Sequence, residues 1–567
     1  MNGQWIFLSL LAAAMIFYLV TEGILGAKKR RKRLRASFGA VPHSEYRRAS
    51  VARYWEEQHM SSPSTGDVDD LTWGDLDLDA VFERVNACHT LIGEEYLYAL
   101  LHRPAAEEVS QARETLMAEL EDETFRLRIQ TALVRLGKRI GVELPTVLFH
   151  AGEFALDAPW RFVCCALLPF APLFFLWAAP TLVTAAVALA LANNVRLYLK
   201  TQKLLEGWLE TLSYLLASLR CARALQRMLA GRCPALAAQL GEAQQMERRL
   251  GAGASLLSIS PQSDLYMLAQ LFGMLTLIPL LQYQRTICRL KSAEQELGRF
   301  FELLGEIDTA VSVLSYRHSL RVFTRPQFTA ALHVRARDML HPLLTEEENG
   351  VPNDLDLAAN WLLTGSNASG KSTFIKAVAI NNILAQSIGT CTAEQYELKR
   401  APVVTSMAVR DDLAAGESYF VAEIRSMRRL VELLESGTSF YCFVDEVLKG
   451  TNTTERIASS CAVLRYLCAP GCLCIAATHD LELTQLLAGE YENHHFSEQV
   501  SRQGVCFDYR LKDGPCRTRN AIRLLEQYQF PAAIVAEAQV LVEKNEPEGD
   551  VPRAVGSMEQ RKEGDGK

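Results

Sequence analysis

A glycine-rich loop between an apolar strand and a helix limits the folds open to this chain. Residues 360–364 read Asn-Trp-Leu-Leu-Thr, and residues 365–373 read Gly-Ser-Asn-Ala-Ser-Gly-Lys-Ser-Thr. This is a complete GxxxxGK[ST] pattern, and a helical pattern follows it to Gln386. A strand, a tight loop and a helix in this order are typical of a parallel sheet covered by helices. We therefore expect an α/β domain here.

The residue types in this loop suit the phosphates of a nucleotide. Glycines let backbone N–H groups wrap the phosphates at the positive end of a helix. Lys371 is expected to reach the β- and γ-phosphates of ATP, and the Ser372 hydroxyl is expected to ligate Mg²⁺. The residues expected to bind ATP from this loop are Gly365, Ser366, Asn367, Ala368, Ser369, Gly370, Lys371, Ser372 and Thr373.

Two later apolar runs end in residues suited to hydrolysis. Residues 440–446 read Phe-Tyr-Cys-Phe-Val-Asp-Glu, a pattern typical of a strand buried in a parallel sheet. Asp445 is the expected second Mg²⁺ ligand, and Glu446 is placed to polarise the attacking water. The run 473–477 is followed by Thr-His, so His479 should lie at the same carboxyl edge, although a lone histidine is more often structural. On these patterns alone, Lys371 and Glu446 are the expected catalytic residues.

A further loop has the composition of a phosphate contact. Residues 411–418 read Asp-Asp-Leu-Ala-Ala-Gly-Glu-Ser and precede a helical pattern. Ser418 would then contact a second nucleotide across a dimer. The alternative is an ordinary capped helix with Ser418 in its first turn.

The N-terminus has the pattern of an uncleaved membrane anchor. Residues 5–20 are apolar apart from Ser9, the stretch continues to Gly26 with Glu22 as its one charge, and six basic residues follow at 28–33. A secretory signal peptide carries its positive charges before the apolar core. By the positive-inside rule the N-terminus lies outside and the basic run lies in the cytoplasm.

A second apolar region is expected to cross the membrane twice. Residues 162–195 carry no charge and include Pro169, Pro172 and Pro180, which suggests two short spans turning near 177–180. A buried hairpin of a soluble domain is the alternative. Residues 265–281 are interpreted as a buried or interfacial helix. In the other arrangement 162–195 crosses once and 265–281 crosses back, but the arginines between them argue against it.

The composition of the chain bears on nucleic-acid binding, on zinc binding and on the compartment of the soluble part. The net charge of −7 argues against a basic coat for nucleic acid but leaves a local patch open. The fourteen cysteines lack zinc spacing, so reduced thiols and a cytosolic soluble part are expected. Residues 37–70 are polar and indicate a linker, whereas 78–300 have mostly helical spacing.

The motifs occur in the order found in the ATPase domain of the MutS family of DNA mismatch repair proteins, which this chain resembles over about 338–543. The matching segments are 341–344, 351–354, 364–373, 384–389, 411–418, 444–446, 449–453 and 477–479. More weakly, 73–104 and 305–316 are similar to the start and end of the family's helical core and lever domain.

This resemblance implies a relative of ABC ATPases that works as a dimer. It implies Ser418 as the γ-phosphate contact supplied to the partner, Glu446 as the hydrolytic residue and His479 as the switch histidine. Asn367 would contact phosphate, and 451–453 would lie at the dimer interface.

The sequence also departs from the family pattern. Ser366-Asn367-Ala368 stand where Pro-Asn-Met is usual, and Tyr419 stands where the family has threonine. The segment 27–72 is too short for a mismatch-recognition domain. The apolar 162–195 region replaces lever helices, so the chain resembles the membrane-anchored MutS-like proteins of bacteria.

The expected fold is an α/β P-loop ATPase domain of the ABC/MutS type joined to an all-α core/lever domain with transmembrane helices. The expected divisions are an anchor (1–26), a basic juxtamembrane segment and linker (27–72), the helical part with its hairpin (73–337), the ATPase domain (338–545) and a polar disordered tail (546–567).

The expected function is ATP hydrolysis, with Mg²⁺, in a homodimer that moves helical arms. The chain is expected in the bacterial inner membrane with its ATPase domain in the cytoplasm. DNA is a candidate partner, through arginines such as Arg220, Arg223, Arg227, Arg232, Arg248 and Arg249. The alternatives are an ABC-like transport or remodelling ATPase without DNA binding and an ATP-gated scaffold for a protein partner.

Overall fold

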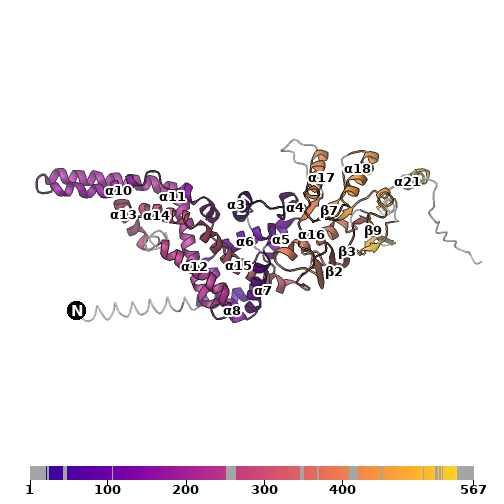
Figure 1. The fold of residues 1–567 in the computed structure, drawn as a ribbon, viewed down its shortest axis with the longest axis horizontal. Coiled ribbons are helices and arrows are strands. Elements are labelled where there is room, and N and C mark those ends of the chain that lie inside the picture. Colours follow the sequence, from indigo (N-terminus) through magenta and orange to yellow (C-terminus); the bar gives the residue numbers. More distant parts are fainter. Residues whose placement is uncertain are drawn as a thin grey trace, which may run out of the picture.

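One end of the molecule consists of helices, and the other combines β-sheets with helices (Figure 1). The computed structural model describes residues 21, 25–42, 48–104, 106–250, 264–344, 350–366, 369–407, 419–448, 451–501, 504–516, 522, 525 and 528–545. Most of the anchor expected at 1–26, the tail expected at 546–567, and Asn367, Ala368 and Ser418 lie outside these residues.

The helical part is built around the long helix α15 (Glu294–Ser319), which is buried over most of its second half. Asp308 of α15 is fully buried, and its carboxylate accepts hydrogen bonds from the backbone N–H groups of His89 and Thr90 at the start of α6. A carboxylate at a helix N-terminus satisfies free N–H groups and the helix dipole. The surrounding helices are α4 (Asp70–Asp75), α5 (Leu78–Val85), α6 (Leu91–His102), α7 (Glu107–Leu120), α8 (Glu123–Leu136), α9 (Leu144–His150) and α12 (Pro234–Leu250).

The linker expected at 37–70 is instead largely part of the helical core. Helices α2 (Arg48–Val51) and α3 (Arg53–Ser61) lie within it, and Tyr54 and Trp55 are buried. The ring of Tyr54 stacks on Phe301 at 4.3 Å, and that of Trp55 stacks on His102 at 4.5 Å. The linker prediction was wrong because these aromatic partners lie far away in the sequence.

The basic run 28–33 is exposed on a helical segment that covers residues 25–37. Its C-terminal end is attached to the helical part by buried Leu34, by an ion pair between Arg35 and Glu123, and by Phe38. The guanidinium of Arg126 lies 3.8 Å from the Phe38 ring centre. The six positive charges are therefore held in solvent beside a fixed attachment point.

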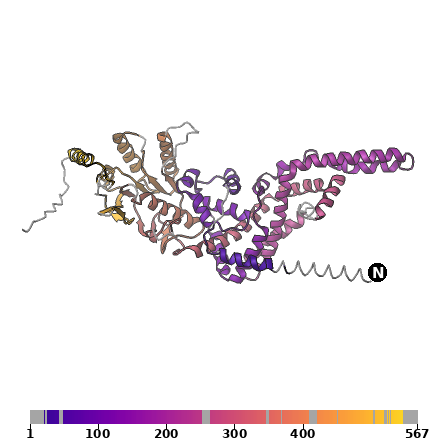
Figure 2. The same cartoon turned by 180° about the vertical axis from the view of Figure 1, so that it is seen from behind.

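The apolar region 162–195 forms a hairpin that projects from the helical part (Figures 1 and 2). One arm consists of α10 (Trp160–Leu167) and the 3₁₀-helix η2 (Leu168–Phe175), and the other is the start of α11 (Pro180–Leu229). Proline lacks an N–H donor, so Pro169 and Pro172 disfavour a regular α-helix in the first arm. Within the described residues, one helical segment, Pro180–Thr201, is long and apolar enough to cross a membrane by length and composition.

The hairpin's apolar side chains point mostly away from the protein. In the 18-residue window of highest hydropathy in Pro180–Thr201, 22% of residues are buried. Phe174 is 88% and Trp177 99% exposed. Such exposure does not fit the alternative of a buried soluble hairpin, because that alternative requires these side chains to be packed in a core. The other exposed apolar residues are Val163, Leu167, Leu168, Phe170, Leu173, Phe175, Leu176, Leu182 and Leu189.

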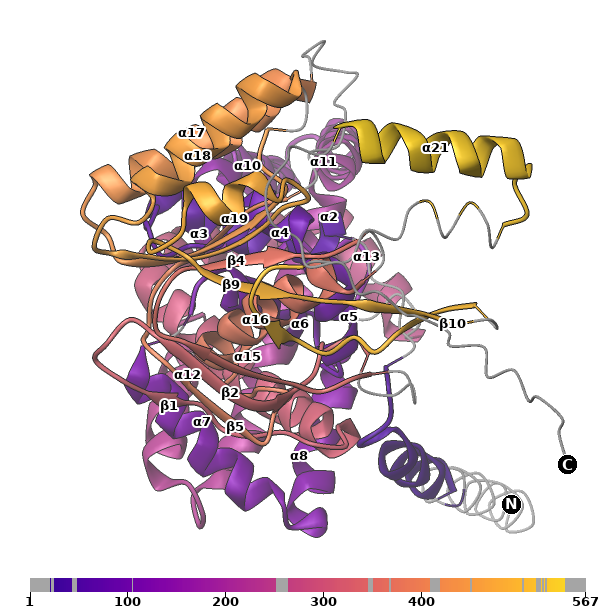
Figure 3. The same cartoon turned by 90° about the vertical axis from the view of Figure 1, so that its right-hand side faces the viewer.

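The main sheet has six strands in the order β12-β9-β4-β8-β7-β6. All neighbours pair in parallel except β12 with β9. Helix α16 (Lys371–Ser387) covers one face, and α17 (Tyr419–Glu435), α18 (Thr453–Tyr466) and α19 (Glu482–Leu486) cover the other (Figure 3). The strands are β4 (Trp361–Thr364), β6 (Val403–Ser406), β7 (Phe440–Asp445), β8 (Cys472–Ala477), β9 (Glu492–His495) and β12 (Lys512–Asp513).

A second sheet, in the order β1-β5-β2-β3, lies beside α16. Strand β2 (Val334–Met339) crosses the domain boundary expected at 337/338. Its alternating pattern, with Val334 and Ala336 buried and Arg335 exposed, is typical of a strand with one covered face. The sheet part thus begins upstream of that boundary. The strands are β1 (Gln327–Phe328), β2 (Val334–Met339), β3 (Asn353–Leu357) and β5 (Gln395–Leu398), while β10 (Glu498–Ser501) and β11 (Gly504–Phe507) form a separate hairpin and α21 (Ala532–Asn545) follows.

Two arginines of the helical part bind the C-terminal end of α16. Arg113 of α7 is paired with Glu306 and donates to the Ser387 carbonyl at 2.7 Å. Arg317 of α15 donates to the Gly389 carbonyl at 2.8 Å and to the Thr390 hydroxyl at 2.9 Å. A helix leaves its last carbonyl groups without backbone donors, and here the guanidinium groups donate to carbonyls at this end. Their positive charges also interact favourably with the negative end of the helix dipole. The two guanidinium groups are here called the arginine clamp.

Helix α4 makes a second connection between the two parts. The Asp75 carboxylate accepts from the Thr405 hydroxyl at 2.7 Å and from the Met407 N–H at 2.9 Å, beyond the end of β6. Burial raises the pKa of Asp75. Asp69 pairs with Arg429 of α17. The helical part thus holds the elements on both sides of the segment 408–418.

Candidate nucleotide site

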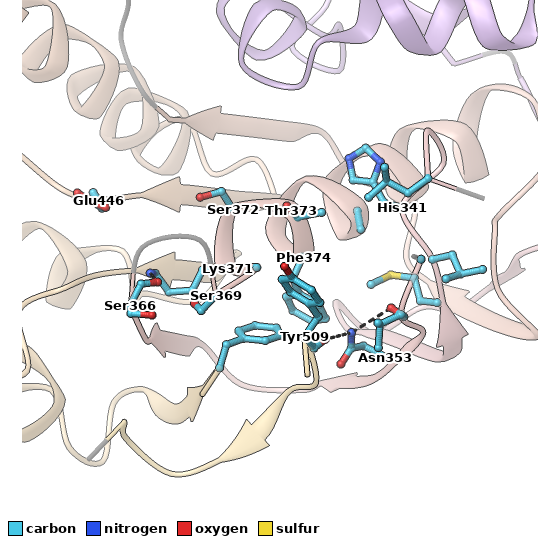
Figure 4. Close-up of a pocket in the computed structure, with 18 of the residues that line it drawn as sticks. His341, Asn353, Ser366, Ser369, Lys371, Ser372, Thr373, Phe374, Glu446 and Tyr509 are labelled. Carbon is cyan, nitrogen blue, oxygen red and sulfur yellow. Dashed lines mark hydrogen bonds between the residues drawn. The ribbon is translucent and has the colours of Figure 1, made fainter. Parts of the chain in front are cut away.

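Three neighbouring parallel strands bring the expected site residues to one edge of the main sheet. The glycine-rich loop follows β4, His479 follows β8, and Glu446 follows β7. Strand β8 lies between β4 and β7, and the carboxyl ends of parallel strands share one edge. These residues line one cavity of about 420 Å³ (Figure 4).

The backbone conformation of the glycine-rich loop requires glycine at positions 365 and 370. Gly365 has φ +146° and Gly370 has φ +106°, values that side chains disfavour. A Cβ atom on Gly365 would lie 2.6 Å from the Phe496 carbonyl oxygen. Ser366, Ser369, Gly370, Lys371, Ser372 and Thr373 all line the cavity.

Lys371 stands at the start of α16 and is 4% exposed. Its Nζ donates to the carbonyl oxygens of Gly365 and Ser366, at 2.8 and 2.9 Å. The ammonium group is therefore held against the loop that would enclose phosphate (Figure 4). Phosphate oxygens would have to replace these carbonyls as acceptors if Lys371 binds a nucleotide.

Glu446 and His479 form a pair at the cavity wall. The Glu446 Oε1 atom lies 2.7 Å from His479 Nε2. Glu446 has φ +62°, a left-handed conformation that costs a residue with a Cβ about 1–2 kcal/mol. Asp480 is bound by both Nε and Nη2 of Arg456, which fixes the chain beside the histidine. Strained backbone held in place by its surroundings is frequent at active sites.

The donor types of Ser372 and Asp445 fit Mg²⁺. A hydroxyl and a carboxylate supply the hard oxygen ligands that this ion prefers. Ser372 lines the cavity and is exposed, while half-buried Asp445 ends β7. Among the described residues, no group of three or more His, Cys, Asp or Glu is arranged to hold a metal by itself. With Ser372 and Asp445 as its protein ligands, Mg²⁺ would take the rest of its coordination shell from water and phosphate.

The far end of the cavity contains residues that sequence reasoning missed as ligands. His341, Asn353 and Tyr509 lie there, away from Glu446 (Figure 4). Asn353 Nδ2 donates to the Tyr509 carbonyl at 2.9 Å, and its Oδ1 accepts from the Leu511 N–H at 2.7 Å. Burial lowers the pKa of His341 to about 4, so this imidazole is neutral near pH 7. This end of the cavity offers an aromatic ring and neutral polar groups.

Other expected residues are not brought to the cavity. In the segment expected at the dimer interface, the Thr451 hydroxyl bonds to Glu455, and Asn452 caps α18 just before Thr453. Arg232, a candidate DNA contact, is paired with Asp122 at 2.5 Å and Glu119 at 3.4 Å. Its charge is largely compensated within the protein.

Comparison with known proteins finds matches over the C-terminal half of the chain. Residues 361–546 match the family model of MutS domain V, a match that begins at β4. The chain is 30% identical over 258 residues to the DNA mismatch repair protein MutS of Thermus thermophilus, covering 45% of this chain and 31% of that protein. Its identity to the protein of the same name from Pseudothermotoga lettingae is 32% over 287 residues, covering 48% and 35%.

The chain thus spans about a third of the length of these curated relatives. MutS domain V is an α/β domain, in agreement with the sheet that carries the cavity. Residues 361–546, which include the glycine-rich loop, Glu446 and His479, therefore form a domain of the MutS domain V type.

Proposed function

We propose that this protein is a membrane-anchored ATP hydrolase that acts as a dimer and moves its helical part with the nucleotide cycle. The observation that carries the proposal is the convergence of the glycine-rich loop and the Glu446–His479 pair on one cavity. The family relationship supports ATP as the substrate.

The residues have separate tasks in this reaction. Loop N–H groups and Lys371 bind the phosphates, while Ser372 and Asp445 hold Mg²⁺, which supplies charge neutralisation on the phosphate oxygens. Glu446 accepts a hydrogen bond from the attacking water and orients it toward the γ-phosphorus. His479, at 2.7 Å, positions the carboxylate. The aromatic ring of Tyr509 provides a surface for the base at the other end of the cavity.

Dimerisation would complete the site. Ser418 is proposed to contact the γ-phosphate held by a second copy, in line with its place just before α17. Two matched relatives are named DNA mismatch repair proteins, which makes DNA the first partner to test.

The hairpin is proposed to enter a membrane. From 162 to 175 the first arm is about 25 Å long, and 180–195 of α11 extend about 24 Å, close to the roughly 30 Å hydrocarbon core of a bilayer. Arg161 and Arg196 flank the charge-free region, and Trp177 at the tip suits the opposite interface. This arrangement keeps both sheets and the cavity on the cytoplasmic side and, with the N-terminal anchor, places the N-terminus outside.

The second candidate is an ABC-like transport or remodelling ATPase without DNA binding. It is favoured by the large exposed apolar hairpin and by the internal pairing of Arg232. The two candidates share the hydrolytic site and differ in whether DNA changes its turnover.

The test is the ATPase rate of the full-length protein in lipid nanodiscs with Mg²⁺, with and without duplex or branched DNA. Glu446→Gln should lower kcat at least about 100-fold, because it removes the carboxylate that orients water. Glu490→Gln is the matched control, since Glu490 belongs to a surface pair with Arg465. Near-normal turnover of E446Q would remove Glu446 from its role. Stimulation by DNA that weakens with salt would favour the first candidate, and no salt-dependent DNA binding would favour the second.

A further inference from the structure

A second, shorter helical hairpin lies against the base of the apolar hairpin. Helices α13 (Asp264–Thr276) and α14 (Ile278–Lys291) are joined at Leu277, which has φ +57° and ends α13. Residues 265–284 carry no charge. The views from both sides place α13 beside the projecting arms (Figures 1 and 2).

The turn of this shorter hairpin is fixed to α11 at a defined level. Asn194 is fully buried, and its Nδ2 donates to the Leu275 carbonyl at 2.9 Å. Gly273 packs so closely against α11 that a Cβ there would lie 3.0 Å from the Tyr198 ring. Asn194 and Tyr198 lie on either side of Arg196, where the charge-free part of α11 ends. The turn therefore lies at the border between the apolar arms and the charged body.

One face of α13 at this level is apolar and exposed. Leu271 is 56%, Phe272 49% and Leu275 43% exposed. Leu275 follows Leu271 by four positions and Phe272 by three, so it shares a face of the helix with each of them. The charges return on α14 with Arg285, which is exposed. With 13 residues α13 is too short to cross the bilayer, and an apolar helix of this length with one exposed face suits an interfacial position.

We propose that the α13 face, formed by Leu271, Phe272 and Leu275, contacts the acyl chains of the cytoplasmic leaflet as a half-inserted wedge beside the spanning hairpin. This inference rests on the proposed membrane insertion. Lipid is the occupant because the face continues the exposed apolar surface of α10, η2 and α11 at the level of Asn194. The wedge and the hairpin together set how deeply the protein sits in the membrane.

The test uses full-length protein in nanodiscs with an environment-sensitive fluorescent amino acid at one position at a time. Position 272 reports the wedge, position 174 the spanning hairpin, and position 424 is the control, an exposed isoleucine on α17. Phospholipids carrying a nitroxide near the headgroup or deep in the acyl chain serve as quenchers. Each labelled protein is checked for unchanged ATPase rate.

We expect at least twofold quenching at 272 by the shallow nitroxide, stronger quenching at 174 by the deep one, and none at 424. Quenching at 174 without quenching at 272 would overturn the wedge and leave the membrane insertion standing. The absence of quenching at both positions would overturn insertion and wedge together. Energy transfer between two copies labelled at 272, without lipid quenching, would make the occupant a second protein and also overturn the wedge.

Discussion

The buried ion pair of the arginine clamp allows a quantitative test of how the two parts are joined. The Arg113 side chain is 1% exposed and that of Glu306 9%. Arg113→Met removes both guanidinium donors to the carboxylate and the donor to the Ser387 carbonyl. Breaking one partner of a buried pair typically costs about 3–5 kcal/mol, because the other charge stays buried. At about 2–4 °C per kcal/mol for a unit of this size, Tm should fall by about 6–20 °C.

The assay is thermal unfolding of the full chain in nanodiscs, followed by tryptophan fluorescence. Buried Trp73 reports on the helical part and buried Trp361 on the main sheet. Arg335→Met is the matched control, because the Arg335–Asp356 pair has a 3.0 Å contact but both side chains are 58% exposed. An exposed pair contributes at most about 1 kcal/mol, so Tm should fall by less than about 4 °C.

A double variant distinguishes the cost of leaving Glu306 charged and unpaired from the cost of lost packing around Arg113. Arg113→Met with Glu306→Leu leaves no buried charge, so much of the lost stability should return. The bond to the Ser387 carbonyl stays absent, and the recovery should be incomplete. If R113M loses no more stability than R335M, or if the double variant loses the sum of the two single losses, the clamp does not work as described.

Three further predictions follow from single side chains. Gly93→Ala places a methyl group 2.3 Å from Asp308 Oδ2 and should cost about 1–3 kcal/mol in urea unfolding, whereas Gly74→Ala, with open space around it, should cost almost nothing. Burial lowers the pKa of His102 to about 4. As the pH drops below 6.5, this imidazole is protonated in the unfolded chain before it is protonated in the folded protein. The free energy of unfolding should therefore fall by up to about 3 kcal/mol as the pH drops from 6.5 to 4. This component should be missing in His102→Phe. Tyr509→Ala should raise the KM for ATP about 5- to 100-fold with little change in kcat, and Tyr509→Phe should restore it; unchanged KM would exclude a contact with the base.

The convergence of Lys371, Glu446 and His479 on one cavity could be predicted because its signals are local. Each of Lys371, Glu446 and His479 follows an apolar run whose length and pattern indicate a strand. Parallel strands place their carboxyl ends at one edge, so the meeting of these residues required only that the strands be neighbours. The order β4-β8-β7 satisfies this condition.

Contacts between distant segments could not be predicted in this way. Tyr509 is 156 positions from Asn353, and no periodic pattern marks a single tyrosine in a loop. Tyr54 and Trp55 stand in a polar stretch, and their burial depends on Phe301 and His102. The clamp likewise joins Arg113 to a carbonyl 274 residues away. One sequence contains no pairwise information of this kind.

Helix α16 carries Lys371 at one end and meets the arginine clamp at the other, about 25 Å away. If nucleotide binding shifts this helix, the free energy of that shift is shared with α7 and α15. Thermodynamic linkage is reciprocal, so a force on the helical part changes nucleotide affinity by the same factor by which the nucleotide changes the arrangement of the helices. If the hairpin enters a membrane as proposed, membrane thickness or tension acting on it would then appear as a change in nucleotide affinity, and the protein would report on the state of the bilayer.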